Sequence, residues 1–291
     1  MSTLNSALAQ YEKMKKALSG NTVSQEDRLK KYFTTVLPKG VKEKQKRIRI
    51  LPTLDGQSPF QEVKFHELQV DGQWVKLYDP EQEKKRSPLN EVREELLSTG
   101  NESDKELAKT YRSKTFYIVK IIDRDNESDG VKFWRFKYKA KGLGVLDKIG
   151  PILINKGDIF DPETGRDLIL TLTSEKSNNG KEYTNITSVM HDDPSPLSTD
   201  VAQSDLWLSD ELTWSDVYSK KPEEYLDMVA KGETPRWSST LGKYVSDIEE
   251  TDSIGSESTN NETSKLVNET PDSVNVVNNA PIQEIDDDLP F

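Results

Sequence analysis

The chain has 291 residues, of which 33% are apolar and 31% are charged, so much of its length is not packed core. It contains no cysteine, which excludes disulfides, thiolate metal sites and cysteine nucleophiles. The formal net charge of -11 is unevenly distributed, because residues 1–190 carry 34 basic and 28 acidic side chains whereas residues 191–291 carry 6 and 23. A basic body joined to an acidic tail is typical of a polyanion-binding protein whose tail competes for the same surface.

Apolar residues at helical spacing predict an N-terminal helical arm over residues 1–20. Lysines near the C-terminal end of this helix favour its dipole. The sequence contains no run of about 18 apolar residues, and its N-terminus does not combine a basic segment with an apolar one. We therefore expect a soluble, intracellular protein.

Alternating apolar and polar residues predict a series of short strands after the arm. These strands cover residues 46–51, 60–70, 73–78, 115–123, 131–140, 167–173 and 183–190. Asp71-Gly72 is a strong signal for a hairpin turn between the second and the third of them. Residues 81–110 have a charged, mostly helical pattern, and residues 143–149 form a short predicted helix.

Short strands, hairpin turns and a helix before the last strand pair indicate a small antiparallel barrel, closed or partly open. The predicted fold class is therefore mainly β with accessory helices. The core, over residues 21–200, is predicted to be an oligonucleotide-binding (OB) fold barrel.

A helical extension is predicted to follow the barrel over residues 201–240. Residues 207–229 form two helical pieces, of which the first is capped at Thr213 and the second opens at Pro222. Residues 241–291 are rich in Ser, Thr, Asn, Glu and Asp without periodicity, so we expect a disordered acidic tail there.

Basic and aromatic residues are interleaved over residues 111–117 and again over residues 132–139. Single-stranded nucleic acid is held in just this way, by cations that bind its phosphates and rings on which its bases stack. Strand alternation divides the second segment between two faces. The face predicted to form a groove carries Phe133, Arg135, Lys137 and Lys139. The opposite face, predicted to pack in the core, carries Trp134, Phe136 and Tyr138.

Each of these features has a structural alternative. A strand aromatic is often a core residue, and alternating Lys and Arg can form an ordinary solvated face. We favour the groove because basic residues come from three segments with a local positive excess, namely Arg47, Arg49, Arg112, Lys114, Arg135 and Lys137.

The sequence offers little for catalysis, so we expect a protein that is not an enzyme. The histidines are His66 and His191, and no glycine loop matches a phosphate cradle. Aspartate pairs such as Asp123 with Asp125 are commoner in turns than in magnesium sites. Two other classes remain open: an acidic protein-binding adaptor or nucleic-acid mimic, and an RNA-binding regulator.

The order of these segments resembles the T-even phage single-stranded DNA-binding, or helix-destabilising, protein family over roughly residues 4–232. The residues that carry the likeness are Ile48-Arg49-Ile50-Leu51-Pro52, Ser58-Pro59-Phe60, His66, Asp71-Gly72-Gln73-Trp74, Arg112, Phe116-Tyr117, Trp134-Arg135-Phe136, Asp147-Lys148-Ile149 and Tyr183.

The resemblance implies an OB barrel that binds single-stranded DNA during phage DNA replication, recombination and repair, in the cytoplasm of a bacterial host and outside the virion. It implies phosphate contacts at Arg49, Arg112 and Arg135. It also implies stacking at or near Phe116, Tyr117, Trp134 and Tyr183, although alternation places Trp134 in the core. The candidate DNA-binding residues, from pattern and resemblance together, are Arg47, Arg49, Trp74, Tyr111, Arg112, Lys114, Phe116, Tyr117, Phe133, Trp134, Arg135, Lys137, Lys139 and Tyr183.

The chain departs from the family in two places. The family has a zinc subdomain with one histidine and three cysteines; His66 matches the histidine, but charged residues 79–90 replace the cysteines, so we expect no zinc and no other cofactor. The family's N-terminal basic motif for cooperative contacts is missing from residues 1–10. Self-association on DNA stays open, since lysines further along the arm can substitute.

The chain finishes with acidic residues, an apolar dipeptide and an aromatic residue: Asp286, Asp287, Asp288, Leu289, Pro290 and Phe291. This ending resembles the C-terminal tip of bacterial single-stranded DNA-binding proteins, which enters an apolar, basic-rimmed pocket on replication and repair enzymes. The resemblance predicts that the tip binds replication, recombination and repair proteins. The alternative is an acidic tail that finishes in this way by chance.

Overall fold

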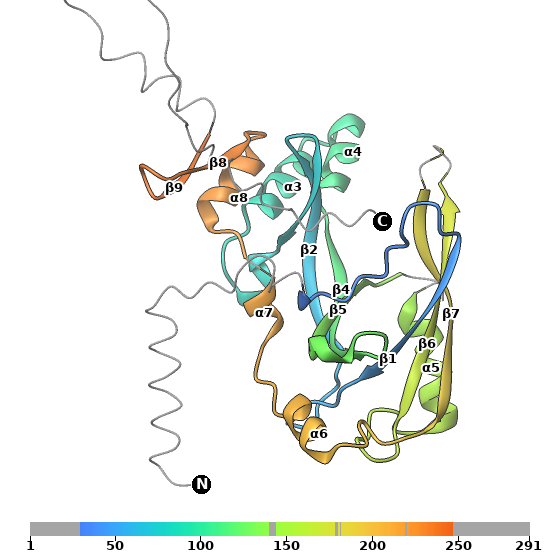
Figure 1. Cartoon of the computed structure of the whole chain (residues 1–291). Helices are drawn as coiled ribbons and strands as arrows, with labels where there is room; N and C mark the ends of the chain where they lie inside the picture. The colour runs from blue at the N-terminus through green and yellow to red at the C-terminus, as the bar shows by residue number, and fades with distance from the viewer. Residues whose placement is uncertain (1–29, 140–143, 178–179, 181, 219, 247–291) are drawn as a thin grey trace, which may run out of the picture. The chain divides into compact units, whose positions relative to one another are not determined.

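The computed structural model describes residues 30–139, 144–177, 180, 182–218 and 220–246 (Figure 1). The predicted N-terminal arm, the C-terminal tip and most of the predicted tail lie outside this part of the chain. The described residues form two compact units. The first unit contains residues 30–62 and 116–218, and the second contains residues 63–115 and 220–246.

Antiparallel strands form the first unit. They are β1 (Glu43–Ile50), β4 (Ser113–Asp123), β5 (Val131–Lys137), β6 (Arg166–Lys176) and β7 (Glu182–Pro194). They pair in the order β5-β4-β1-β6-β7, and the helix α5 (Val145–Lys156) connects β5 to β6. A Greek-key strand set with a helix before its last two strands is the connectivity of the OB fold. The prediction of a mainly β fold with accessory helices is confirmed.

Period-two alternation explains the core of this unit. Ile48 and Ile50 of β1 point inward, where they meet Val119 and Ile121 of β4 and Leu170 of β6. Fully burying an aliphatic side chain of this size contributes about 1.5–3 kcal/mol, so this cluster is a main source of the unit's stability.

Helix α5 is longer than the predicted 143–149, because it runs on to Lys156 through Pro151. It begins where the carboxylate of Asp147 accepts a hydrogen bond from the Gly144 backbone N–H at 2.8 Å. A proline inside a helix removes one backbone hydrogen bond. Here Ile149 and Ile152 are buried in the barrel core, and this packing keeps the helix continuous past the proline.

Two short helices follow the barrel, α6 (Val201–Leu208) and α7 (Trp214–Val217). Helix α6 begins at the first residue of the predicted extension, before the two helical pieces predicted over residues 207–229. Helix α7 is capped as predicted, since the Asp216 carboxylate accepts from the Thr213 backbone N–H at 2.7 Å. Trp207 is buried in a small cluster with Leu51 and Val131, which anchors this segment to the barrel.

The second unit combines one long hairpin with helices. Its elements are β2 (Gln61–Val70), β3 (Gln73–Tyr78), η1 (Pro80–Glu83), α3 (Pro88–Ser98), α4 (Glu102–Thr110), α8 (Glu223–Ala230), β8 (Pro235–Ser238) and β9 (Lys243–Ser246). The Asp71-Gly72 turn is present as predicted, with φ of 51° and 74°. The hairpin of β8 and β9 was not predicted, and β9 lies inside the segment expected to be disordered tail.

His66 lies fully buried on β2, where the related family holds zinc. Its Nδ1 donates to the Tyr111 carbonyl at 2.7 Å, and its Nε2 lies 3.5 Å from Oδ1 of Asp79. Oδ1 of Asp79 also accepts from the Ser87 hydroxyl at 2.9 Å. Burial raises the pKa of Asp79, but hydrogen bonds from His66, Ser87 and the Glu81 backbone outweigh it and hold the pKa well below its usual value.

This arrangement does not fit a zinc site. Structural zinc sites need four ligands, usually thiolates and imidazoles, and the chain has no cysteine to join His66. Within the described ranges, no three His, Asp or Glu side chains converge as metal ligands would.

No helix among the described residues has both the length and the apolar character needed to span a membrane.

Candidate nucleic-acid interface

The strands β4 and β5 form a two-stranded ribbon that carries most of the predicted first-unit site residues. Facing pairs are Phe116 with Lys137, Ile118 with Arg135, and Lys120 with Phe133. Because paired residues share a face, these six side chains lie on the outer face of the ribbon. The inner face carries Val119, Ile121, Trp134 and Phe136, all in the core cluster. The predicted division of β5 into a basic face and a core face is therefore correct through Lys137.

Cations lie over rings on the outer face. The Arg135 guanidinium is 5.8 Å from the centroid of the Phe116 ring and 4.7 Å from that of Tyr218. The Lys137 ammonium is 5.9 Å from the Phe116 centroid. Cation–π contacts of this length fix the cations along the ribbon. The rings of Phe116 and Phe133 are each only 3% exposed, so they support the cations and offer no open face to a base.

The ribbon carries an exposed ring just past the end of β5. Tyr138 is 52% exposed and its ring centroid lies 6.4 Å from that of the half-buried Tyr117. Tyr117 in turn packs against Phe136 at 6.0 Å. Burial, followed by the charge of Glu62, raises the pKa of Tyr117. Lys139 is exposed beside this cluster. The lysines on either side of Tyr138 in the chain, Lys137 and Lys139, add cations to this exposed ring, and single-stranded nucleic acid needs both kinds of group.

The strands β6 and β7 approach this end of the ribbon. The Tyr183 hydroxyl donates to Glu175 at 2.8 Å, and this hydrogen bond raises the pKa of the tyrosine. Hydrogen bonds from Asn185 and Tyr183 lower the pKa of Glu175, and the positive charge of Lys139 adds to the effect. Tyr183 and Lys139 therefore interact with the same carboxylate.

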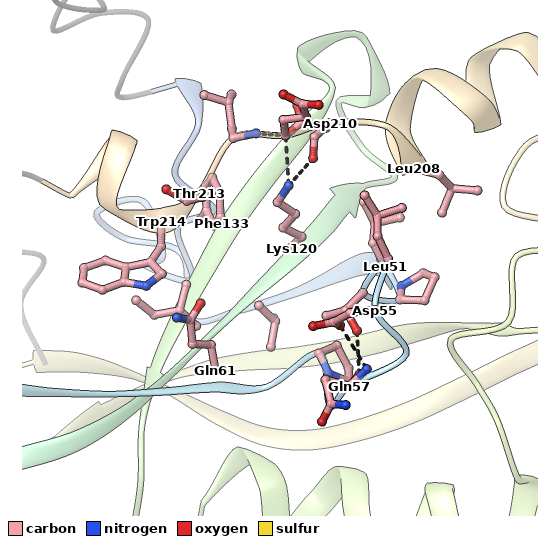
Figure 2. Close-up of a pocket in the computed structure, with 18 of the residues that line it drawn as sticks. Leu51, Asp55, Gln57, Gln61, Lys120, Phe133, Leu208, Asp210, Thr213 and Trp214 are labelled. Atoms are coloured by element: carbon pink, nitrogen blue, oxygen red, sulfur yellow. Dashed lines mark hydrogen bonds and ion pairs between the residues drawn. The ribbon is translucent and has the colours of Figure 1, made fainter. Parts of the chain in front are cut away.

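A pocket of about 800 Å³ lies at the other end of the ribbon (Figure 2). Its floor comes from Ile118, Lys120 and Phe133, and its walls come from the loop after β1 and from the segment between α6 and α7. Figure 2 shows Trp214 on one side of the hollow and Lys120 directed at Asp210, whose carboxylate is 3.1 Å away. Aromatic walls of this size can enclose a planar ring.

The charge of the pocket argues against phosphate. Its lining contains one lysine, Lys120, which is already paired, and the acids Asp55, Asp210 and Glu211. Phosphates would be repelled from this rim.

Besides Phe116 and Phe133, two further candidates are buried. Arg49 is 0% exposed; its guanidinium bonds to Asp167 at 3.2 Å and to the Ser195 carbonyl at 2.7 Å. Trp134 is 1% exposed and its ring packs 4.7 Å from that of Phe136. Neither side chain can reach DNA in this structure. Arg47 remains half-exposed, in an ion pair with Asp192 at 2.8 Å.

The remaining candidates belong to the second unit. Trp74 is 40% exposed on β3 and Arg112 is exposed before β4. Tyr111 packs against the apolar cluster around Leu77. Lys114 pairs with the buried Glu67 at 2.7 Å. Of these, Trp74 and Arg112 are the most accessible to a ligand.

Sequence reasoning missed several residues of the interface. Tyr138 was assigned to the core; its ring does lie on the side of Tyr117, but β5 ends at Lys137 and the ring is left 52% exposed. Trp207 and Trp214 were seen only as parts of helices, and Tyr218 was not singled out. The aromatic residues of the segment 207–218 are a usable signal, since so many rings are unusual in a solvated extension.

The strands of the first unit have the connectivity of the OB fold, and the β4–β5 ribbon carries cations and rings side by side. These two features together are typical of the class of proteins that bind single-stranded nucleic acid. The model of the family described as gp32 DNA binding protein like matches residues 42–225, which is more than half of the chain. The chain belongs to this family, as its resemblance to the T-even phage proteins predicted. This is a family of DNA-binding proteins and not of enzymes, and membership supports single-stranded DNA as the ligand. A comparison with curated proteins gave no match.

Proposed function

We propose that this protein coats single-stranded DNA without sequence preference during phage DNA replication, recombination and repair in the host cytoplasm. The observation that carries the proposal is the β4–β5 ribbon, where Arg135 and Lys137 lie over supporting rings and Tyr138 is open to solvent. Phosphates bind the cations and bases stack on the exposed rings, so neither contact depends on base identity.

We further propose that the acidic tail regulates this binding and recruits replication proteins through its last residues. The tail competes with DNA for the basic ribbon, because residues 247–291 carry 12 acidic side chains and one basic one. Once DNA displaces the tail, the tip from Asp286 to Phe291 is available to enzymes of replication and repair.

A titration with labelled oligo(dT) tests DNA binding itself. We expect binding that survives an excess of duplex competitor, because stacking needs unpaired bases. Competition by oligo(U) then measures any preference for RNA. Loss of binding on addition of duplex would contradict the proposal.

Deleting residues 247–291 tests the role of the tail. The cut keeps the described hairpin intact, since β9 ends at Ser246. We expect the truncated chain to bind oligo(dT) about tenfold more tightly at low salt, because a covalently linked competitor is removed. The matched control is Phe291→Ala, which keeps every tail charge; it should bind DNA like the full chain and fail to co-purify with replication proteins. Weaker DNA binding by the truncated chain would contradict the competitor role.

A further inference from the structure

The hairpin of β8 and β9 carries an exposed aromatic surface that lies outside the residues matched by the family model. Figure 1 shows this hairpin beside α8. Trp237 of β8 faces Tyr244 of β9, and their ring centroids are 5.2 Å apart at 73°. Tyr244 meets Tyr225 of α8 at 5.0 Å and 85°. The three rings thus form one edge-to-face ladder, which holds the outermost ring in place.

The ladder is buried at one end and open at the other. Tyr225 is buried in the apolar cluster of the second unit, whereas Trp237 is 59% exposed. The ammonium of Lys221 lies 5.0 Å from the Tyr225 centroid and 5.7 Å from that of Tyr244. A large ring that is rigidly supported and mostly exposed has a free face for another planar group.

The charges around Trp237 favour an anionic ligand. Residues 234–246 include Arg236 and Lys243 and no acidic residue. Both basic side chains are exposed, and the strand register places them on the face of the hairpin opposite Trp237 and Tyr244. A site for an apolar protein segment would be lined by more aliphatic side chains than this one.

From these observations we infer that the β8–β9 hairpin is a second contact for single-stranded DNA, with one base stacked on Trp237 and the DNA backbone passing round the edge of the hairpin to phosphate contacts at Arg236 and Lys243 on its other face. The inference rests on the proposed function, because it assumes the same ligand. It adds a stacking site that the family match does not include. The hairpin therefore adds a DNA contact in the second unit.

The test uses the full chain and an oligo(dT) longer than the roughly 16 nucleotides of the largest single-barrel sites. We expect Trp237→Ala to weaken binding about 5-fold to 150-fold, which corresponds to the loss of one stacked base. Trp237→Phe should retain most of the affinity, because it keeps a ring. Leu241→Ala is the matched control, since Leu241 is equally exposed in the same hairpin but has no ring.

Photo-cross-linking gives a second readout that is independent of stability. With 5-iododeoxyuridine in the oligonucleotide, we expect a cross-linked peptide that contains Trp237. If the unaltered chain binds oligo(dT) while Trp237→Ala binds equally well and no cross-link maps to residues 234–246, the hairpin is not a DNA contact and a protein ligand becomes the better explanation. If the unaltered chain does not bind oligo(dT) at all, the proposed function itself is wrong.

Discussion

Asp167→Ala should lower the free energy of unfolding by about 3–5 kcal/mol, the usual cost of removing one partner from a buried ion pair. Asp167 accepts from Arg49 at 3.2 Å and from two nitrogens of Arg124 at 3.0 Å. Burial lowers the pKa of Arg49, whereas Asp167 acts in the opposite direction. Without this carboxylate, a fully buried guanidinium would keep its charge and lose its counterion.

Urea denaturation of the purified protein measures the effect. The matched control is Asp192→Ala, which breaks the half-exposed pair with Arg47. Exposed ion pairs contribute at most about 1 kcal/mol, so the control should unfold near the unaltered midpoint. An Asp167→Ala midpoint no lower than that of the control would show that the buried pair adds nothing.

Tyr138→Ala should weaken oligo(dT) binding by about 1–3 kcal/mol, the range observed when one stacked base loses its ring. The ring is half-exposed and lies beside Tyr117 near Lys137 and Lys139. Because it is not part of the core cluster, its loss should leave the unfolding midpoint nearly unchanged.

Tyr138→Phe separates stacking from hydrogen bonding, and it should bind like the unaltered chain. Ile154→Ala is the exposed control, since Ile154 is 85% exposed on α5. Phe133→Ala is less informative, because Phe133 is buried and its truncation would also open a cavity. Equal affinities for Tyr138→Ala and the unaltered chain would remove this end of the ribbon from the interface.

Much of the barrel was predictable because its strands alternate regularly. An alternating strand was expected over residues 46–51, and its Ile48 and Ile50 are buried in the core; the Asp71-Gly72 turn was expected from its residue types alone. Local rules suffice in such cases. They fail for β8 and β9, which are four residues each and include a proline, so that no period is visible.

The interface was only partly predictable, because burial depends on contacts between distant parts of the chain. Residue type and resemblance made Arg49 a candidate, but neither could show that its guanidinium is covered by Asp167 and the Ser195 carbonyl. The pocket likewise depends on Trp207 and Trp214, which lie far along the sequence from Phe133. Residue types and spacing predicted the ribbon. Which of its side chains are covered by distant segments and which are exposed could be seen only in the structure.

The central claim is that cations along the ribbon bind the phosphates of single-stranded DNA, and a salt series tests it most directly. Each phosphate contact releases counterions. For every tenfold increase in salt concentration, the logarithm of the affinity for oligo(dT) should therefore fall by about 0.7 per contact. With contacts at Arg135, Lys137 and Lys139, a fourfold increase in salt should weaken binding roughly 20-fold. An affinity that stays constant across the same range would contradict the account.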